Sequence, residues 1–506
     1  MTTLHRTPLT LAEKIDCAAR ALAIQDQHGA ISELSREFTI SRPTLYEARE
    51  TATAVLEAHF KKSEPEGKPI HVVVDEAQLR RAIVALRVMS PNSLRSIEDL
   101  LPILYPGATP SFGKIQSITS LAEAEAAKFN ARLDLSSIEA AALDEMFSQG
   151  NPVLAGVDLD TSYLFSLSLR ASRSGADWVD VLEIGKAQGL DLSVVVKDAG
   201  AGIDAGVCQA FADAERRDDC FHALYEMNKV QRQLEQKAYA AIALEQEQAK
   251  KLSTIRAQDQ PERVAQKRKL ATASKECIKA IERYERFAAA KTKAHEAMDY
   301  IDVNAGTLRT GEQTRSMLEA AAEEMQSIDD WKSKKVARYL RNRAPGLSLA
   351  IADLHTRLQA LVPVYTSDAV CLAGLIRHWV GRVRKHPGPF PLNDRARHLL
   401  GAFSLLKDLL GDRIDALFEA IEALLEKHHR ASSAIEGFNA ALRPHLYVHK
   451  GVTQNFLDLF RAYYNLRTRR SGRHKGISAH QALIGSPVND WLSLIGFPPS
   501  SAATVH

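Results

Sequence analysis

The short stretch LSVVVKDAGAGID at Leu192–Asp204 constrains the fold more than any other part of the chain. Its apolar, β-branched residues predict a buried parallel strand that ends at Lys197, and Gly200 and Gly202 predict the turn into a helix. Asp198 then follows the carboxyl end of a buried strand. Open α/β sheets place their chemistry at this end, so the stretch predicts a functional carboxylate at a sheet edge.

The neighbouring segments predict the rest of an α/β domain over residues 133–224. Short β-branched and aromatic runs predict strands, and apolar residues at helical spacing predict helices between them. The order of three strands, a helix, a strand, a helix and a short strand resembles the ribonuclease-H-like core, with its mixed strand directions. The segments are the apolar run Ser137–Phe147, the strands Val153–Asp158 and Thr161–Arg170, the helix Ser174–Gly189, the strand Leu192–Lys197, the helix Gly202–Arg216 and the strand Asp219–Leu224.

The N-terminal residues 1–62 predict a helix-turn-helix domain, because a short helix and a tight turn precede a longer helix. Ser41 is expected to cap that longer helix. An ordinary three-helix packing unit is the alternative. The expected helices are Leu11–Gln27, Ala30–Phe38 and Arg42–Phe60, and DNA binding would direct Arg42, Thr44, Tyr46 and Arg49 toward the major groove or its phosphates.

A second helical domain is expected at residues 70–132, after a charged linker with two prolines at residues 61–70. A Pro/Gly turn separates two of its helices, and the later helix begins near Ser111. A second helix-turn-helix would direct Ser111, Lys114 and Gln116 toward DNA, and plain helical packing is an equal alternative.

From residue 225 to residue 430 the sheet pattern stops, and an all-helical insertion is predicted. Segments rich in Ala, Glu, Lys, Gln and Arg at Tyr225–Gln258 and Glu262–Ile301 predict a long helical hairpin. Proline and glycine at residues 386–391 predict a break. Further helices are expected at Asp330–Arg343, Leu347–Leu361, Ala369–Lys385, Arg395–Leu410 and Arg413–Arg430.

The C-terminal region predicts an amphipathic helix at Ser432–Arg443, which carries Glu436, and a further helix at Thr453–Arg467. Between Arg461 and Lys475 there are six Lys and Arg residues and no acidic residue. This one-sided charge predicts a track for DNA phosphates, and a solvated tail is the alternative. The expected phosphate contacts here are Arg443, Arg467, Arg469, Arg470 and Arg473.

Three acidic residues in these elements predict a metal site: Asp144 near the end of the first strand, Asp198 after the central strand, and Glu436 on the late helix. Phosphodiester cleavage and joining use two divalent cations ~3.5–4 Å apart, which activate the attacking oxygen and stabilise the leaving one. Carboxylate oxygens suit Mg²⁺ or Mn²⁺. One Asp would bridge both ions, and the other two acids would each hold one.

These stretches resemble the DDE transposase/integrase superfamily, in particular bacterial insertion-sequence transposases and their Mutator-like relatives. The resemblance covers about residues 137–224 and 432–485. It implies Asp144, Asp198 and Glu436 as the metal-binding triad, with two Mg²⁺ (or Mn²⁺) per active site. The matching sequences are ALDEMF, VLAGVDLDTSYLFSLSLR, VVVKDAGAGIDAGV, SSAIEGFNAALRPHL and YYNLRTRR…HKGISAHQAL.

The same resemblance implies the partners of the chain. Double-stranded DNA, both as transposon ends and as target, is expected to bind a homodimer or a larger assembly. The expected location is the cytoplasm of a bacterium, in association with the nucleoid.

Several other acids compete with the three. Because the helical block separates Asp198 from Glu436, sequence spacing does not constrain the third acid. Glu436 is preferred because Asn439 and Arg443 lie on nearby faces of its helix, as in the Glu helix of the family. The competitors are Glu422 and Glu426 for the third position and Asp158 and Asp160 for the first, while Asp204 is expected to cap the next helix.

Two further features have counterparts among such enzymes. Cys220 and His222 resemble a Cys/His pair of the Mutator-like relatives, and a packed strand is the favoured alternative. Trp331 resembles a Trp that stacks a flipped base, and a place in the core is the favoured alternative. Trp331 opens a basic helix that suits a phosphate backbone through Lys332, Lys334, Lys335, Arg338, Arg341 and Arg343.

The whole-chain composition restricts these interpretations. The net charge is only +3, from 65 basic and 62 acidic residues, so any DNA-binding surface must be local. Five scattered cysteines without CxxC spacing predict neither a disulfide framework nor a zinc ribbon. The sequence shows no apolar stretch typical of a membrane span or a signal segment, so no membrane partner is expected.

The function predicted from the sequence is a DNA transposase that binds element ends and catalyses metal-dependent strand cleavage and strand transfer. A domesticated, non-catalytic DNA-binding regulator and a nuclease of the same fold are the alternatives. The predicted domains are residues 1–62, residues 70–132, a core of residues 133–224 with 431–485, the insertion 225–430 and a C-terminal tail 486–506.

Overall fold

The computed structural model divides the chain into two compact units, Met1–Val73 and Val74–His506. The predicted linker at residues 61–70 and the predicted break at residues 386–391 lie outside the described residues. No helix in the described part of the chain is long and apolar enough to cross a membrane. The described residues are 9–24, 29–60, 74–198, 200–385, 392–448 and 451–500.

The first unit is a three-helix bundle. Arg20 and Glu37 form two hydrogen bonds of 2.7 Å between the first two helices. The turn before the third helix places Thr39 at a φ of 53°, and the Thr44 N–H donates to Ser41 Oγ at 3.3 Å, so Ser41 caps this helix as predicted. The helices are α1 (Leu11–Ala23), α2 (Ala30–Glu37) and α3 (Arg42–Phe60). Their core is Cys17, Ala21, Leu34 and Leu45.

The second unit contains a five-stranded sheet in the order β3-β2-β1-β4-β5. β1 and β2 pair antiparallel, as do β2 and β3, whereas β1 pairs parallel with β4 and β4 pairs parallel with β5. Two helices, α7 (Gly175–Lys186) and α8 (Ala201–Ala210), lie between β3, β4 and β5 in the sequence. The strands are β1 (Ala140–Ser148), β2 (Asn151–Asp158), β3 (Leu164–Leu169), β4 (Val194–Lys197) and β5 (Glu215–Asp218).

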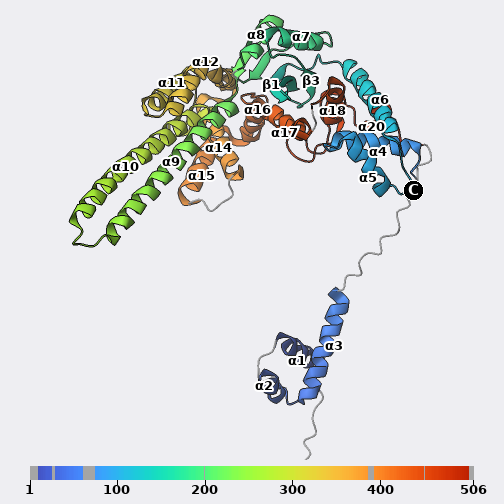
Figure 1. Ribbon diagram of the computed structural model, residues 1–506, viewed down its shortest axis with the longest axis vertical. Helices are drawn as coiled ribbons and strands as arrows, with labels where there is room; N and C mark the ends of the chain where they lie inside the picture. The colour runs from blue at the N-terminus through green and yellow to red at the C-terminus, as the bar shows by residue number, and fades with distance from the viewer. Residues whose placement is uncertain are drawn as a thin grey trace, which may run out of the picture. The chain divides into compact units, whose positions relative to one another are not determined.

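Alternating residues of β1 supply two different cores, because successive side chains of a strand point to opposite faces. Ala141 and Leu143 pack with α7 and α8. Ala140 and Ala142 pack with α17 (Ser433–Val448) and α18 (Gln454–Leu466). The sheet is therefore a middle layer with helices on both faces (Figure 1).

The glycines after β4 serve close packing more than turn geometry. Gly200 has a φ of −65°, which any residue adopts. The turn that the sequence predicted here therefore does not require glycine for its backbone conformation. A Cβ at Gly202 would lie 2.0 Å from the Arg173 carbonyl oxygen, and one at Gly206 would lie 2.3 Å from Trp178 Cβ. These two glycines allow α8 to approach α7 and so fix where the chain leaves β4.

The prediction of a last strand at Asp219–Leu224 is wrong. The strand is β5, and Asp219 instead caps the long helix α9 (Cys220–Thr254) by accepting from the Phe221 N–H at 2.8 Å. The sequence of β5, ERRD, has no apolar run from which a strand could be predicted. The charged Arg217 is buried in this strand and forms ion pairs with Glu215 and Asp353. The preceding helix α8 also ends at Ala210, earlier than predicted.

Among its described residues, the insertion has one small two-stranded sheet, β6 and β7, which the sequence did not predict, and its other regular elements are helices. The expected hairpin is formed by α9 and α10 (Figure 1). Helix α11 was also not predicted. The elements after α9 are α10 (Gln260–Ala297), β6 (Ile301–Asp302), β7 (Thr307–Leu308), α11 (Gly311–Ser327), α12 (Trp331–Gln359), α13 (Val362–Tyr365), α14 (Ser367–Lys385), α15 (Leu392–Leu410), a 3₁₀ turn (Gly411–Arg413) and α16 (Ile414–Glu426).

One helix, α12, replaces the two helices predicted at Asp330–Arg343 and Leu347–Leu361, and it continues through Pro345. Tertiary contacts hold it across this point. Arg343 donates to Asp218 at 2.9 Å, and a Cβ at Gly346 would lie 2.0 Å from the Asp218 carboxylate. Contacts with β5 therefore override the local preference of proline to end a helix.

The N-terminal and C-terminal parts of the second unit share one core with the α17 face of the sheet. Ser111 caps α6 by accepting from the Lys114 N–H at 3.4 Å. Arg81 donates to Asp490 at 2.7 Å and to the Phe497 carbonyl at 2.6 Å, so residues beyond 486 pack on α4. The helices concerned are α4 (Glu76–Met89), α5 (Leu94–Leu104), α6 (Phe112–Ala131), α19 (Ala479–Ile484) and α20 (Trp491–Leu494).

Candidate active site and basic groove

Asp144 and Asp198 lie at corresponding points of two neighbouring parallel strands. Leu143 of β1 pairs with Lys197 of β4, and each aspartate is the next residue along its chain. Both continue the side-chain positions that face α17, since Ala142 and Val196 belong to the core on that face. The register of the sheet thus brings the two carboxylates to one face beside the end of β4. The prediction that Asp144 lies near the end of its strand is wrong, because β1 continues to Ser148.

Helix α17 lies on the same face and brings Glu436 and Asn439 to this place. Asn439 Nδ2 donates to Asp144 Oδ2 at 2.6 Å, and the Glu145 N–H donates to Asp144 Oδ1 at 2.8 Å. Glu436 precedes Asn439 by three residues, so the two share a face of the helix. The Gly200 N–H donates to Asp198 Oδ1 at 2.8 Å, which fixes the second aspartate.

The electrostatics of Asp144 reflect the charge gathered around it. Burial raises the pKa of the Asp144 carboxyl to about 6, and the hydrogen bonds from Asn439 and the Glu145 backbone oppose this rise. The negative charges of Asp198 and Glu436 raise the same pKa further. Asp198 and Glu436 are therefore each close enough to Asp144 to repel its charge.

The side chains do not converge on a single point in this structure. Among the described residues, no group of three His, Cys, Asp or Glu side chains is arranged to hold a metal ion. Asp144 and Asp198 are aligned by the sheet, whereas Glu436 is set by the helix opposite. What the arrangement offers to a cation is a partly buried edge of high negative charge.

The rival acids of the first position have other partners. Asp158, at the end of β2, accepts from the Thr161 N–H at 2.9 Å and so closes the turn into β3. Asp160 forms ion pairs with His429 at 3.4 Å and with Arg473 at 3.9 Å. Asp158 therefore stabilises the turn between β2 and β3, and the Asp160 side chain is engaged by His429 and Arg473.

The other competing acids are also paired. Glu422 forms an ion pair with Arg377, and Glu426 lies 4.0 Å from Arg473. Asp204 was expected to cap α8, but no side chain caps this helix, and Asp204 instead pairs with Lys197 at 3.1 Å. These pairings distinguish all three from Glu436.

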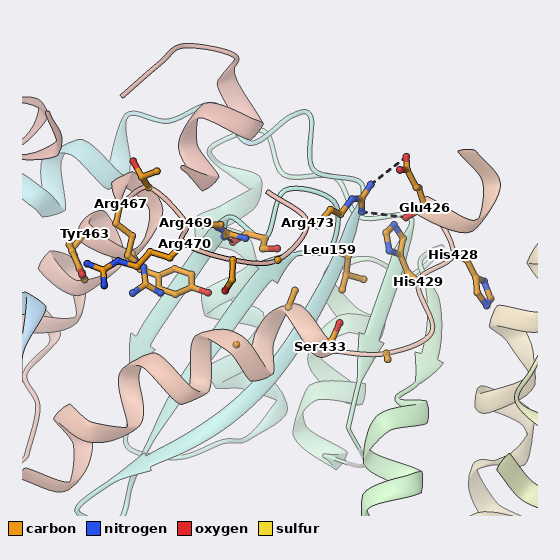
Figure 2. A pocket seen from close by; sticks show the side chains of 18 of the residues that line it. Leu159, Glu426, His428, His429, Ser433, Tyr463, Arg467, Arg469, Arg470 and Arg473 are labelled. Atoms are coloured by element: carbon orange, nitrogen blue, oxygen red, sulfur yellow. Dashed lines mark hydrogen bonds and ion pairs between the residues drawn. The ribbon is translucent and has the colours of Figure 1, made fainter. Parts of the chain in front are cut away.

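A large groove lies beside the first turns of α17 and encloses about 1320 Å³. Figure 2 shows Arg467 toward one end of it and Arg473 beside Glu426 toward the other. Ser433, Ala434 and Gly437 line it from α17, on a different face of the helix from Glu436 and Asn439. The groove is thus lined by residues of α17 other than Glu436 and Asn439.

The arginines predicted as a phosphate track border this groove, but several are engaged within the fold. Arg469 donates to the Ser162 carbonyl at 2.9 Å, and Arg467 stacks 4.7 Å from the Tyr464 ring centroid. Arg473 pairs with Asp160. Arg470 is exposed in the loop, and Arg443 is exposed on α17.

Most of the other predicted DNA contacts are exposed side chains, and three basic residues are paired or partly buried. Lys114 pairs with Glu76 at 2.7 Å. Arg49 is partly buried on α3. In α12, Arg343 is committed to Asp218. The exposed residues are Arg42, Thr44 and Tyr46 on α3 and Lys335, Arg338 and Arg341 on α12.

The favoured interpretations of Trp331 and Cys220 are wrong. The Trp331 side chain is 65% exposed at the start of α12 and is not in the core. Cys220 begins a helix, not a strand, and burial raises the pKa of its thiol to about 12, so the thiolate that metals require is disfavoured. His222 lies 6.2 Å from the Tyr339 ring and has a packing role.

Two residues beside the carboxylates gained a role only from the structure. The sequence placed Asn439 near Glu436 without assigning it a contact, and it reaches Asp144. Lys197 is 3% exposed, and its ammonium lies 3.4 Å from Asp218 and 3.1 Å from Asp204. The available signal for Lys197 was a lysine ending an apolar strand, since such a charge needs partners when buried.

Comparison with known proteins adds little to this picture. No protein-family model and no curated protein matches the chain. One solved structure that it resembles is the Drosophila P element transposase strand transfer complex, at 12% sequence identity and a TM-score of 0.32. The match covers 73% of this chain and 100% of that chain. A TM-score of this size does not establish a shared fold.

Proposed function

We propose that this chain is a DNA transposase with a ribonuclease-H-like core, which cuts DNA strands and joins them to a target in a metal-dependent reaction. The observation that carries the proposal is the register of β1 and β4, which aligns Asp144, in the middle of β1, with Asp198 just past the carboxyl end of β4. Glu436 on α17 contributes to the same electrostatic field. The strand order β3-β2-β1-β4-β5 supports this assignment of the core.

Asp144, Asp198 and Glu436 would hold the Mg²⁺ or Mn²⁺ ions, two per active site. Their oxygens are the donors that these hard cations prefer. Burial raises the pKa of Asp144, with a smaller contribution from the charges of Asp198 and Glu436, and a bound cation would offset both effects. When bound, the ions supply activation of the attacking oxygen and stabilisation of the leaving oxygen.

The chain's own residues would orient this site and its substrate. Asn439 holds one Asp144 oxygen at 2.6 Å and directs the other toward the Glu145 N–H. Lys197 anchors the end of β4 through Asp204 and Asp218. The exposed start of α3 would read element ends, and exposed arginines such as Arg443 and Arg470 would contact phosphates. Two ends reacting together would require a dimer or a larger assembly.

The decisive experiment is strand transfer of a labelled DNA end, taken from sequence flanking the native gene, with Mg²⁺. Glu436→Gln preserves size and removes one charge, so cleavage and joining should fall together by at least ~100-fold, or about 2.7 kcal/mol of transition-state stabilisation. Glu426→Gln, the matched control, should retain activity. An active Glu436→Gln beside an inactive Glu426→Gln would place the third acid on α16.

A non-catalytic DNA-binding regulator is the second candidate. The observation in its favour is that the described residues contain no converged metal-binding group. Calorimetric titration with Mn²⁺ separates the two candidates without relying on activity. The transposase should bind Mn²⁺, with weaker binding in Asp144→Asn, whereas a regulator should give no titration in either protein.

A further inference from the structure

The hairpin of α9 and α10 continues well beyond the core of the insertion. The apolar core that it shares with α11 and α12 ends at Leu234 on α9 and begins again at Phe287 on α10. We call residues 239–282, between these points, the arm. From its start to Thr254 the arm extends about 24 Å, at ~1.5 Å per helical residue. Figure 1 shows the hairpin pointing away from α11 and α12.

Polar contacts between its two helices hold the arm together close to its end. Gln266 is 7% exposed, and its Nε2 donates to the carbonyl and the side-chain oxygen of Gln248, both at 3.0 Å. Arg263 Nη1 donates to the Ile255 carbonyl at 3.2 Å. Ser274 bonds to Glu245 across the helices. These hydrogen bonds hold the two helices of the arm against each other, so its surface side chains have defined positions.

Charge is distributed very unevenly along the hairpin. Its distal part, residues 248–275, has eight Lys and Arg and only two acidic residues. Its proximal part, residues 220–247 and 276–297, has eight of each sign. The positive charge of the hairpin is therefore concentrated in the distal part. Its basic residues are Lys250, Lys251, Arg256, Arg263, Lys267, Arg268, Lys269 and Lys275.

The basic residues of the two parts also differ in their partners. In the proximal part, Lys229, Lys279 and Lys293 pair with acids. In the distal part, which the structure describes completely, only Lys251 has an acidic partner, Glu247. The distal cations are mostly exposed and remain available to an external anion.

We propose that the distal part of the arm binds the phosphate backbone of duplex DNA outside the active site, without reading its sequence. The proposal rests on the proposed function in taking DNA as the substrate. Lys267, Arg268 and Lys269 are consecutive, so their charges spread around the helix at about 100° intervals. Whichever side of the helix faces the duplex therefore presents a cation, and a cation that contacts a phosphate carries no sequence information.

The same surface is poorly suited to a protein partner. Protein interfaces depend on buried aromatic and apolar anchors at their centre. Between residues 248 and 275 the one large apolar side chain that is well exposed is Val264, at 47%. Phosphates therefore match the distal part of the arm better than an acidic protein surface does.

The test compares two triple variants of the full chain. The distal variant is Lys267→Gln, Arg268→Gln and Lys269→Gln, and the matched proximal control is Lys229→Gln, Lys279→Gln and Lys293→Gln. Binding of a random-sequence duplex is measured by fluorescence anisotropy in EDTA, across ~50–200 mM salt. The distal variant should reduce the slope of log K against log [salt] by about 1–2, because each lost phosphate contact contributes ~0.9 and three side chains at ~100° intervals do not all face one duplex. The control should keep the wild-type slope.

An unchanged slope in the distal variant would overturn the proposal and leave an acidic protein as the partner to seek. Equal losses in both variants would overturn it too, since the effect would then reflect net charge alone. Circular dichroism confirms that both variants are folded. Because the assay contains no metal, it succeeds or fails independently of cleavage, which Asp144→Asn tests separately.

Discussion

The chain contains two strongly basic stretches, residues 461–475 and the distal arm at residues 248–275, and the structure uses them differently. In the first, Arg461 is buried, Arg469 donates to a backbone carbonyl and Arg473 pairs with Asp160. In the second, the lysines and arginines other than Arg263 are exposed, and most have no acidic partner. Sequence alone favoured the first stretch as the DNA track.

The difference teaches that a count of charges does not measure the charge available to a ligand. A guanidinium can cap carbonyls, stack on rings and satisfy buried acids, and it then belongs to the fold. The loop that carries Arg469 and Arg473 folds back onto the turn between β2 and β3, where Ser162 and Asp160 lie. Of the distal cations, Lys251 pairs with Glu247 and Arg263 donates to the Ile255 carbonyl, and the other six are exposed.

The largest expected effect is on stability, from the most buried member of the first stretch. Arg461→Ala should lower the free energy of unfolding by about 3 kcal/mol, because it empties a core site and removes the 3.0 Å bond to the Leu164 carbonyl. Urea denaturation measures this loss. Arg461→Met, which refills the volume, should recover at least half of it, and a full loss in both variants would assign the effect to the charge.

A smaller loss is expected at Arg469. Arg469→Gln removes the 2.9 Å bond to the Ser162 carbonyl and the stack on Tyr464, so thermal unfolding should report a loss of about 1 kcal/mol. DNA affinity should change less than in a variant of exposed Arg470. If Arg469→Gln left stability unchanged but weakened DNA binding, the stretch would act as the track that the sequence suggested.

The next effect concerns acid pH. The hydrogen bond from His429, followed by the charges of His429 and Arg473, lowers the pKa of Asp160. A lowered pKa stabilises the fold above the ordinary Asp value and loses that contribution as pH falls through the folded value. The wild-type protein should therefore lose free energy of unfolding as the pH falls below about 4, and Arg473→Gln should make this loss smaller. The difference between the two proteins should be less than about 1 kcal/mol, because the Asp160–Arg473 pair is partly exposed.

The smallest effect on stability is expected from the arm. The distal triple variant at residues 267–269 should change the free energy of unfolding by no more than about 0.5 kcal/mol, since these side chains are exposed and unpaired with acids. Urea denaturation of this variant beside Arg461→Ala gives the sharpest contrast. A loss above 1 kcal/mol would mean that the arm's charges support the fold after all.

The sequence predicted most of the sheet because β1 to β4 are apolar, and it placed Asp198 at the end of β4 correctly. It missed β5, whose buried Arg217 and Asp218 are paired with charges far along the chain. It also divided α12 at Pro345, because the contacts with β5 that hold this helix are invisible to local pattern.

The candidate site likewise has one part that the sequence predicted and another that it did not. Asp144 and Asp198 could be predicted because each ends or follows an apolar run, and parallel strands bring such positions together. The 2.6 Å bond from Asn439 to Asp144 could not be predicted, because α17 reaches the sheet only after the whole insertion, and the long separation removes any spacing constraint.

What the sequence determined by itself is local: which segments alternate, which have helical spacing, where helices are capped, and where charge accumulates. Tertiary structure decided which of those charges are buried as pairs, as at Arg217 and Lys197, and which remain exposed, as at Lys267 and Arg268. The physical reason is that helix and strand patterns arise from neighbours within a few residues, whereas the cost of burying a charge depends on partners that any part of the chain can supply.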